Sequence, residues 1–165
     1  MKKFLLLTTI AILSAGLAKA QSPVTYRGEI DLGYSFGVGS LAANRVNIHT
    51  VQGLKVGEYF STGVGIGVDY YHEGDAGEVI VPLYLNLKGY IPTTGKVVPY
   101  LSFDVGVGIG ASSGLSGLSG VYLTPAFGIN AGKVKVQLGY NMQQLSDSGI
   151  SLDFNALQIK VGYVF

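Results

Sequence analysis

The chain contains no cysteine, and only 13% of its 165 residues are charged. The absence of cysteine excludes a disulfide scaffold, a thiolate metal site and a lipidated N-terminal cysteine. Soluble proteins carry roughly 25% charged residues, so this composition is unusual for a soluble enzyme. The formal net charge of +1 provides no basic stripe, and we expect no nucleic-acid partner.

The first twenty residues predict a signal peptide. Lys2 and Lys3 form a positive start, Phe4 to Leu17 form an apolar run, and Ala18-Lys19-Ala20 matches a small-x-small cleavage site. The alternative is an N-terminal membrane anchor, but this run is shorter than the ~20 residues that a spanning helix needs. We therefore expect residues 1–20 to be removed and residues 21–165 to form one exported domain.

The exported part has period-two alternation and no long apolar run. From Tyr26 to Val38 the even positions are mostly apolar and the odd positions are polar or glycine, as in a strand with two different faces. Eight segments alternate in this way: residues 26–38, 45–56, 60–71, 79–90, 97–111, 120–131, 133–143 and 154–165. This pattern predicts an all-β fold, an eight-stranded antiparallel up-and-down barrel.

Side-chain volume and charge predict which face of the barrel points outward. The apolar positions of the eight segments carry about 40 bulky side chains, which is too many for the interior of an eight-stranded barrel. The strand charges all fall on the opposite face, which is rich in glycine. An outward Arg or Lys at the bilayer midplane would cost about 2–4 kcal/mol. The apolar face therefore faces lipid, and the fold is a transmembrane β-barrel.

Export, the absence of cysteine and a barrel fold together predict a Gram-negative outer membrane. The links near 57–59, 91–96 and 131–133 are short, as periplasmic turns are, which places both termini in the periplasm. Aromatic residues lie mainly near strand ends, as interfacial girdles require: Tyr26, Tyr34, Phe36, Phe60, Tyr70, Tyr140, Tyr163 and Phe165. Pro82 and Pro125 fall inside strands, where we expect local bulges or strand ends.

Several motifs resemble one family of barrels. The run Val81-Pro82-Leu83-Tyr84-Leu85-Asn86-Leu87-Lys88-Gly89-Tyr90, followed after a short turn by Val98-Pro99-Tyr100, resembles the outer-membrane β-barrel domain family common in Bacteroidota. Gly63-x-Gly65-x-Gly67 and Pro125-x-x-Gly128 fit the same pattern. The ending Val161, Tyr163 and Phe165 resembles the C-terminal signal that engages the barrel-assembly machinery. The resemblance implies an eight-stranded outer-membrane barrel and no catalytic residues.

The charges of the polar face predict an interior network that plugs the barrel. Six basic and four acidic residues are nearly balanced, which favours buried ion pairs; the alternative is a narrow pore for ions or small solutes. The residues are Arg27, Glu29, Asp31, Lys55, Asp69, Lys88, Asp104, Lys133, Lys135 and Lys160.

Two histidines are the candidates for catalysis. His49 should point into the barrel, and His72 should lie in an outer loop beside Glu73 and Asp75. Neither belongs to a nucleophile elbow or a metal-binding pair, so a lipid-modifying enzyme is a minor alternative. The glycine repeats lie within strands with no following helix, and they predict a crowded interior rather than phosphate loops.

The loops opposite the short turns carry acidic residues and one low-complexity stretch. Glu73, Asp75, Asp147 and Asp153 are expected to be solvated, with Glu78 and Arg45 at the rim; divalent cations bridging to lipopolysaccharide are the alternative. Residues 112–120 predict a flexible loop with two exposed leucines, Leu115 and Leu118. We expect a monomer with no cofactor or metal, whose partners are outer-membrane lipids, lipopolysaccharide and the assembly machinery.

Overall fold

The structure is a computed structural model of the chain that describes residues 23–39, 42–72, 77–147 and 150–165. The predicted signal peptide, its cleavage site, and Glu73 and Asp75 lie outside the described residues. Within these four ranges, no helix is long and apolar enough to cross a bilayer.

Strands make up nearly all of the described chain. They are β1 (Val24–Val38), β2 (Arg45–Val56), β3 (Phe60–Tyr71), β4 (Glu78–Tyr90), β5 (Val97–Gly110), β6 (Ser119–Ala131), β7 (Val134–Asp147), β8 (Ile150–Asp153) and β9 (Asn155–Val164). Gln144 lies opposite Asp153, and Asn141 lies opposite Ala156 in the same register, so β8 and β9 together form one barrel strand interrupted at Phe154. The last strand therefore begins four residues before the predicted 154.

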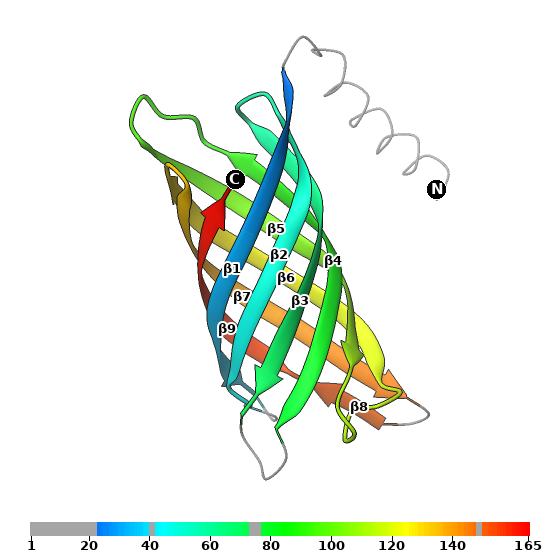
Figure 1. Cartoon of the computed structure of the whole chain (residues 1–165). Coiled ribbons are helices and arrows are strands. Elements are labelled where there is room, and N and C mark those ends of the chain that lie inside the picture. Colours follow the sequence, from blue (N-terminus) through cyan, green and yellow to red (C-terminus); the bar gives the residue numbers. More distant parts are fainter. Residues whose placement is uncertain (1–22, 40–41, 73–76, 148–149) are drawn as a thin grey trace, which may run out of the picture.

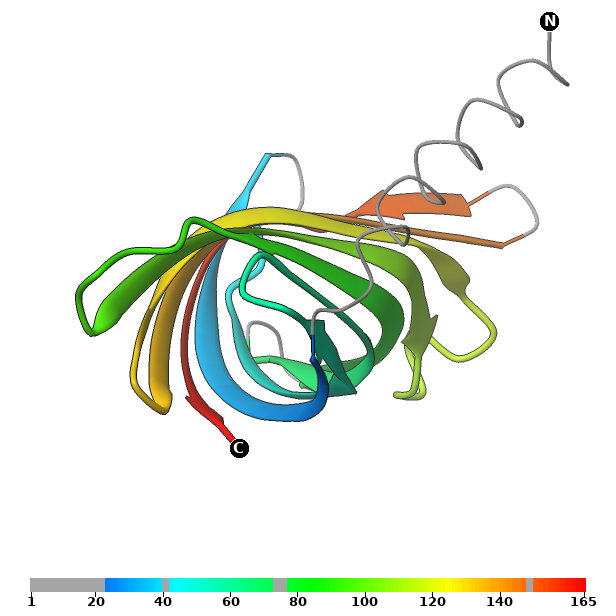
Figure 2. The same ribbon diagram turned by 90° about the horizontal axis from the view of Figure 1, so that it is seen from above.

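The strands form a closed barrel (Figures 1 and 2). Each strand pairs antiparallel with its neighbours along the chain, and β1 closes the sheet by pairing with β9. Counting β8 with β9, the described residues confirm the predicted eight-stranded up-and-down barrel. Full closure pairs every strand on both sides, which is how a sheet can satisfy its backbone inside a bilayer.

The two faces of the barrel follow the predicted alternation. Leu32 is 60% exposed, whereas its neighbour Asp31 is 4% exposed. Val161 and Lys160 differ in the same way, at 52% and 2%. Large apolar side chains therefore cover the outside, and charged side chains fill the inside.

The two ends of the barrel differ in their connections. We call one the turn end: it carries the short β2–β3, β4–β5 and β6–β7 links and both ends of the described chain (Figure 1). Two of these turns contain a glycine in the left-handed region, Gly57 (φ 59°) and Gly132 (φ 63°), where other residues are strained. At the opposite end, which we call the loop end, β1, β3, β5 and β7 end and β2, β4, β6 and β8 begin.

The C-terminus completes the barrel at the turn end. Phe165 and Gly28 exchange two backbone hydrogen bonds at 2.8 and 2.9 Å, and the Phe165 ring lies over the space that a Gly28 side chain would fill. Val161, Tyr163 and Phe165 all point outward. Of the expected girdle residues, Tyr140 lies in the middle of β7 rather than near a strand end.

Pro82 and Pro125 form neither bulges nor strand ends, so that expectation is wrong. Each strand runs through its proline without a change of register and stays paired on one side, with Gly108 opposite Pro82 and Phe103 opposite Pro125. On the other side, ladder pairs are absent for a short stretch and then resume in register. A proline lacks only its own N–H donor, so the sheet loses local pairing but not alignment.

Candidate functional site

The interior of the barrel is the candidate site. Seven of the predicted interior residues are buried to 4% exposure or less: Glu29, Asp31, Asp69, Lys88, Asp104, Lys135 and Lys160. They come from strands around the whole barrel, because each occupies the inward parity of its strand. The closed barrel thus brings together side chains that are up to 131 residues apart in the sequence.

A first group, the Glu29 cluster, consists of Arg27, Glu29, Asp31, Lys88 and Lys135. The Glu29 carboxylate accepts hydrogen bonds from Arg27 Nε at 2.8 Å and from the ammonium groups of Lys88 and Lys135. Lys135 Nζ also lies 2.9 Å from Asp31 Oδ2. The ion pairs join β1 to β4 and β7 and so cross the lumen.

A second group, the Asp69 cluster, is centred on Asp69 in β3. Asp69 Oδ1 contacts Asn47 Nδ2 at 2.6 Å and His49 Nε2 at 2.8 Å. Lys160 Nζ lies 3.0 Å from His49 Nδ1. Because Lys160 donates to His49 Nδ1, the ring proton lies on His49 Nε2, which donates to the Asp69 carboxylate. Arg45 Nε lies 3.8 Å from Asp69 Oδ2.

The other predicted interior charges lie in different surroundings. Asp104 is buried and accepts a hydrogen bond from Asn86. Lys55 is half-buried, with its ammonium 5.2 Å from the centre of the Tyr90 ring. Lys133 is not inside the barrel: it is exposed and lies 5.7 Å from the centre of the Tyr163 ring. It precedes β7 in a turn, where strand alternation no longer fixes the direction of a side chain.

Arg45 is also placed differently from the expectation. Instead of lying at a solvated rim, it is fully buried, donates to Asn141 and stacks on Tyr71 with 5.0 Å between guanidinium carbon and ring centre. The first residue of β2 already follows the inward parity of that strand. Glu78, at the loop end, contacts Ser112.

Inward glycines make room for the rings of neighbouring strands. A Cβ on Gly67 would lie 2.1 Å from the His49 ring, and one on Gly65 would lie 2.3 Å from the Tyr84 ring. Within the Gly63-x-Gly65-x-Gly67 repeat, Gly65 and Gly67 therefore give space to inward rings from β4 and β2, while Gly63 lies against the backbone of β2. This arrangement agrees with the prediction of a crowded interior.

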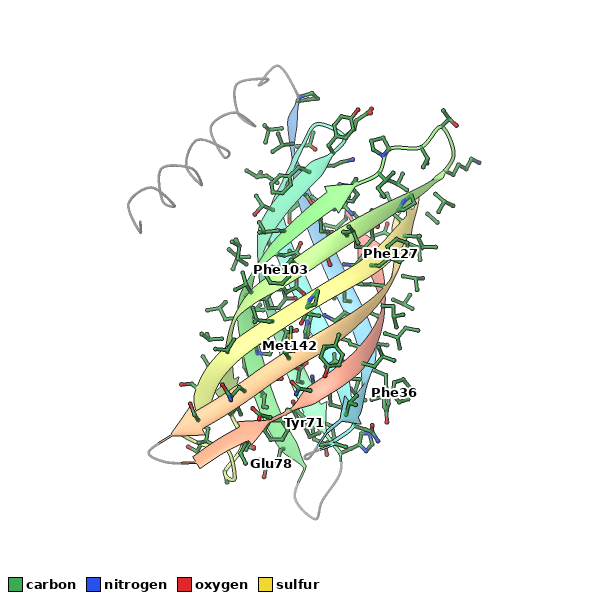
Figure 3. The ribbon with its side chains drawn as sticks, turned by 180° about the vertical axis from the view of Figure 1, so that it is seen from behind. Phe36, Tyr71, Glu78, Phe103, Phe127 and Met142 are labelled. Carbon is green, nitrogen blue, oxygen red and sulfur yellow. The ribbon has the colours of Figure 1, made fainter. Side chains whose placement is uncertain are left out.

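Apolar side chains cluster at the loop end, and the expectation of two exposed leucines is wrong. Leu115 and Leu118 are 5% and 9% exposed, and they cluster with Tyr71, Ile80 and Leu145. We call these five residues the apolar plug. Its loop is held down by Ser112, which contacts Glu78 and accepts a hydrogen bond from the Val79 N–H at 3.2 Å; Figure 3 shows Tyr71 and Glu78 near this end.

The two histidines do not form a common site. His49 is 1% exposed, and its ring contacts Asp69, Lys160 and Tyr84. His72 is exposed, with Nε2 at 3.0 Å from the Tyr34 hydroxyl. Among the residues that the structure describes, no three His, Cys, Asp or Glu side chains are grouped as a metal site.

The sequence pattern also held information about interior residues that we did not predict. Five tyrosines fill much of the lumen, and each occupies the parity opposite to its apolar neighbours: Tyr71, Tyr84, Tyr90, Tyr100 and Tyr122. Tyr84 and Tyr122 stack with their ring centres 5.3 Å apart. Parity alone identifies these residues, once tyrosine is accepted as an interior residue as well as an interfacial one.

Comparisons with known proteins agree on the fold. No protein-family model and no curated protein sequence matches the chain. Among solved structures, the chain is similar to Neisserial surface protein A, with a TM-score of 0.67 and 12% identity over 86% of this chain and 97% of that one. It is also similar to the outer membrane enzyme PagL, with a TM-score of 0.53 and 9% identity over 83% and 98% of the two chains. At these identities the likeness establishes a shared barrel fold and nothing about activity.

Proposed function

We propose that this barrel is an integral outer-membrane protein with a structural or surface-interaction role and a plugged interior. One observation carries the proposal: apolar side chains cover the outside, whereas paired charges cross the inside. This arrangement, with apolar groups outside and charges inside, is stable only where hydrocarbon surrounds the protein.

The outer membrane is the membrane that fits this chain best. The predicted signal peptide favours export, and the two similar solved structures named above are a Neisserial surface protein and an outer membrane enzyme. The turn end, with both ends of the described chain, then faces the periplasm, and the loop end faces outward. The outward side chains of Val161, Tyr163 and Phe165 are available to the barrel-assembly machinery during insertion.

A plugged interior is favoured over a narrow pore. The Glu29 cluster spans the lumen from β1 to β4 and β7, and the Asp69 cluster connects β2, β3 and β9. The apolar plug covers the loop end. An ion would have to break ion pairs and displace packed rings in order to pass.

A non-enzymatic role is favoured over lipid modification. The ring of His49 is enclosed by Asp69, Lys160 and Tyr84, where a lipid ester cannot reach it. His72 is accessible, and its described partner is the Tyr34 hydroxyl. The chain therefore acts through its surface, with outer-membrane lipids and lipopolysaccharide as its surroundings and no cofactor.

Membrane fractionation with heat-modifiable gel migration tests the proposal. We expect the protein in the outer-membrane fraction, migrating faster unheated than boiled, with no steady single-channel steps in planar bilayers. Soluble periplasmic protein would contradict the location, and reproducible steps would favour the pore. Expression of either the wild-type protein or the His72→Ala variant in a bacterial host is expected to leave the structure of the host's lipid A unchanged.

A further inference from the structure

Two recesses meet on the membrane-facing wall along β7. The recess nearer the loop end holds about 340 Å³ and is lined by Val121, Leu123, Tyr140, Met142, Gln143, Gln144, Asp153 and Asn155. The second holds about 560 Å³ and is lined by Leu101, Ser102, Pro125, Ala126, Phe127, Leu138, Gly139, Tyr140 and Leu157. Both include Tyr140, so we treat them as one wall groove; Figure 3 shows Met142 and Phe127 on this wall.

Breaks in backbone pairing on both sides of β7 account for the wall groove. Towards β6, pairs are present at Leu123–Met142 and Ala126–Gly139 but absent between them, where Pro125 has no N–H to donate. Towards the last strand, the regular ladder stops after Asn141 and resumes at Gln144, and the Phe154 N–H donates to the Gln143 carbonyl at 2.7 Å in the interval. The groove therefore lies where the ladders on the two sides of β7 are interrupted.

The polarity of the wall groove changes along its length. Towards the loop end it carries Asp153 and Asn155, with Gln144 Nε2 donating to Asp153 Oδ1 at 2.9 Å. Towards the middle of the wall it is lined mainly by apolar groups, among them Phe127 and Leu138. A polar end at the barrel rim and an apolar end at membrane depth match the two parts of a lipid molecule.

We propose that the wall groove binds one acyl chain of a membrane lipid whose headgroup carries an ammonium group. The acyl chain lies over Phe127 and Leu138, and the ammonium group pairs with the Asp153 carboxylate. This carboxylate is exposed, and the residues lining its recess include no Lys or Arg, which favours a cation over a phosphate. The inference rests on the proposed membrane location.

A third recess on the wall, lined by residues of β1 to β4, provides a matched comparison. It holds about 310 Å³ beside the pairing gap at Pro82 and is lined by Ile30, Ile48, His49, Thr50, Ile66, Gly67, Val68 and Val81. It too is bordered by a strand that contains a proline, but no carboxylate is among its lining residues. We expect it to contact lipid without discriminating between headgroups.

The absence of tryptophan from the chain makes single reporters possible. Tyr140→Trp places a reporter in the wall groove, and Ile66→Trp places one in the recess beside Pro82. Each variant, in detergent micelles, is titrated with brominated phosphatidylethanolamine or brominated phosphatidylglycerol, which quench fluorescence on contact. Heat-modifiable migration verifies folding, and Leu138→Trp replaces Tyr140→Trp if the latter does not fold.

We expect the groove reporter to reach half-maximal quenching at an about two- to fivefold lower concentration of the ethanolamine lipid than of the glycerol lipid, as an exposed ion pair allows. Ile66→Trp should show no preference, and adding Asp153→Asn should abolish the preference of the groove reporter. Equal quenching by both lipids at both positions would overturn the lipid site but leave the membrane barrel intact. A lack of quenching at either position would instead contradict the proposed membrane location.

Discussion

Replacing Glu29 with glutamine should destabilise the barrel strongly. The Glu29 carboxylate is 2% exposed and accepts hydrogen bonds from three cations. Glu29→Gln keeps the shape of the side chain and removes its charge. Within the Glu29 cluster, the three cations would then share Asp31 as their remaining carboxylate.

The expected loss follows from the burial of the cluster. Removing one partner of a buried ion pair costs about 3–5 kcal/mol, because an unpaired charge is left out of water. Lys135 keeps Asp31 Oδ2 at 2.9 Å, which compensates in part. We therefore expect a loss near the lower limit, about 3 kcal/mol in the free energy of unfolding.

Urea unfolding in lipid vesicles, followed by heat-modifiable migration, measures this loss. Glu58→Gln is the matched control, because Glu58 is an exposed carboxylate in the β2–β3 turn. The double variant Glu29→Gln with Lys88→Met should recover part of the loss, since it removes a cation along with its partner. If Glu29→Gln lies within about 1 kcal/mol of wild type, as an exposed pair would, the reasoning on the cluster is refuted.

Three further predictions concern the interior, the loop end and the outer wall. Gly67→Ala should lower the free energy of unfolding by about 1–3 kcal/mol, because the new methyl group displaces the His49 ring. Gly89→Ala should leave it nearly unchanged, because nothing lies within 4 Å of the Gly89 Cβ position; equal urea midpoints for the two variants would contradict this. Leu115→Ala with Leu118→Ala should open the apolar plug and increase proteolytic cleavage of residues 111–118 in sealed vesicles, and unchanged cleavage would refute its role as a closure. Leu85→Arg should cost about 2–4 kcal/mol in the unfolding free energy measured in a bilayer, and a neutral effect would place Leu85 away from the hydrocarbon.

Alternation along the strands made the barrel and its two faces predictable. In a strand, neighbouring side chains point to opposite sides of the sheet. The polarity of Leu32 and Asp31 therefore already indicated that Leu32 points towards lipid and Asp31 towards the interior. Prediction was weaker where alternation stops. Lys133 lies in a turn, and its outward direction depends on the Tyr163 ring, which comes from a different strand.

The loop end and the wall groove could not be predicted from local pattern. The burial of Leu115 and Leu118 depends on packing with Tyr71, Ile80 and Leu145, which are distant in the sequence. The wall groove depends on pairing gaps around β7. A proline in a strand signals such a gap, but only the register shows that the strand continues through it without a bulge.

The central claim is that the apolar face of each strand faces lipid, and spin labels on β7 test it most directly. Because the chain has no cysteine, Val136→Cys, Gln137→Cys and Leu138→Cys each provide one labelling site in vesicles. Gln137 is buried, whereas Val136 and Leu138 on either side of it are exposed. We predict that the labels from Val136→Cys and Leu138→Cys relax strongly with dissolved oxygen, which concentrates in hydrocarbon, while the label from Gln137→Cys stays protected inside the barrel. Strong oxygen relaxation at Gln137→Cys, with the two flanking labels protected, would contradict the account.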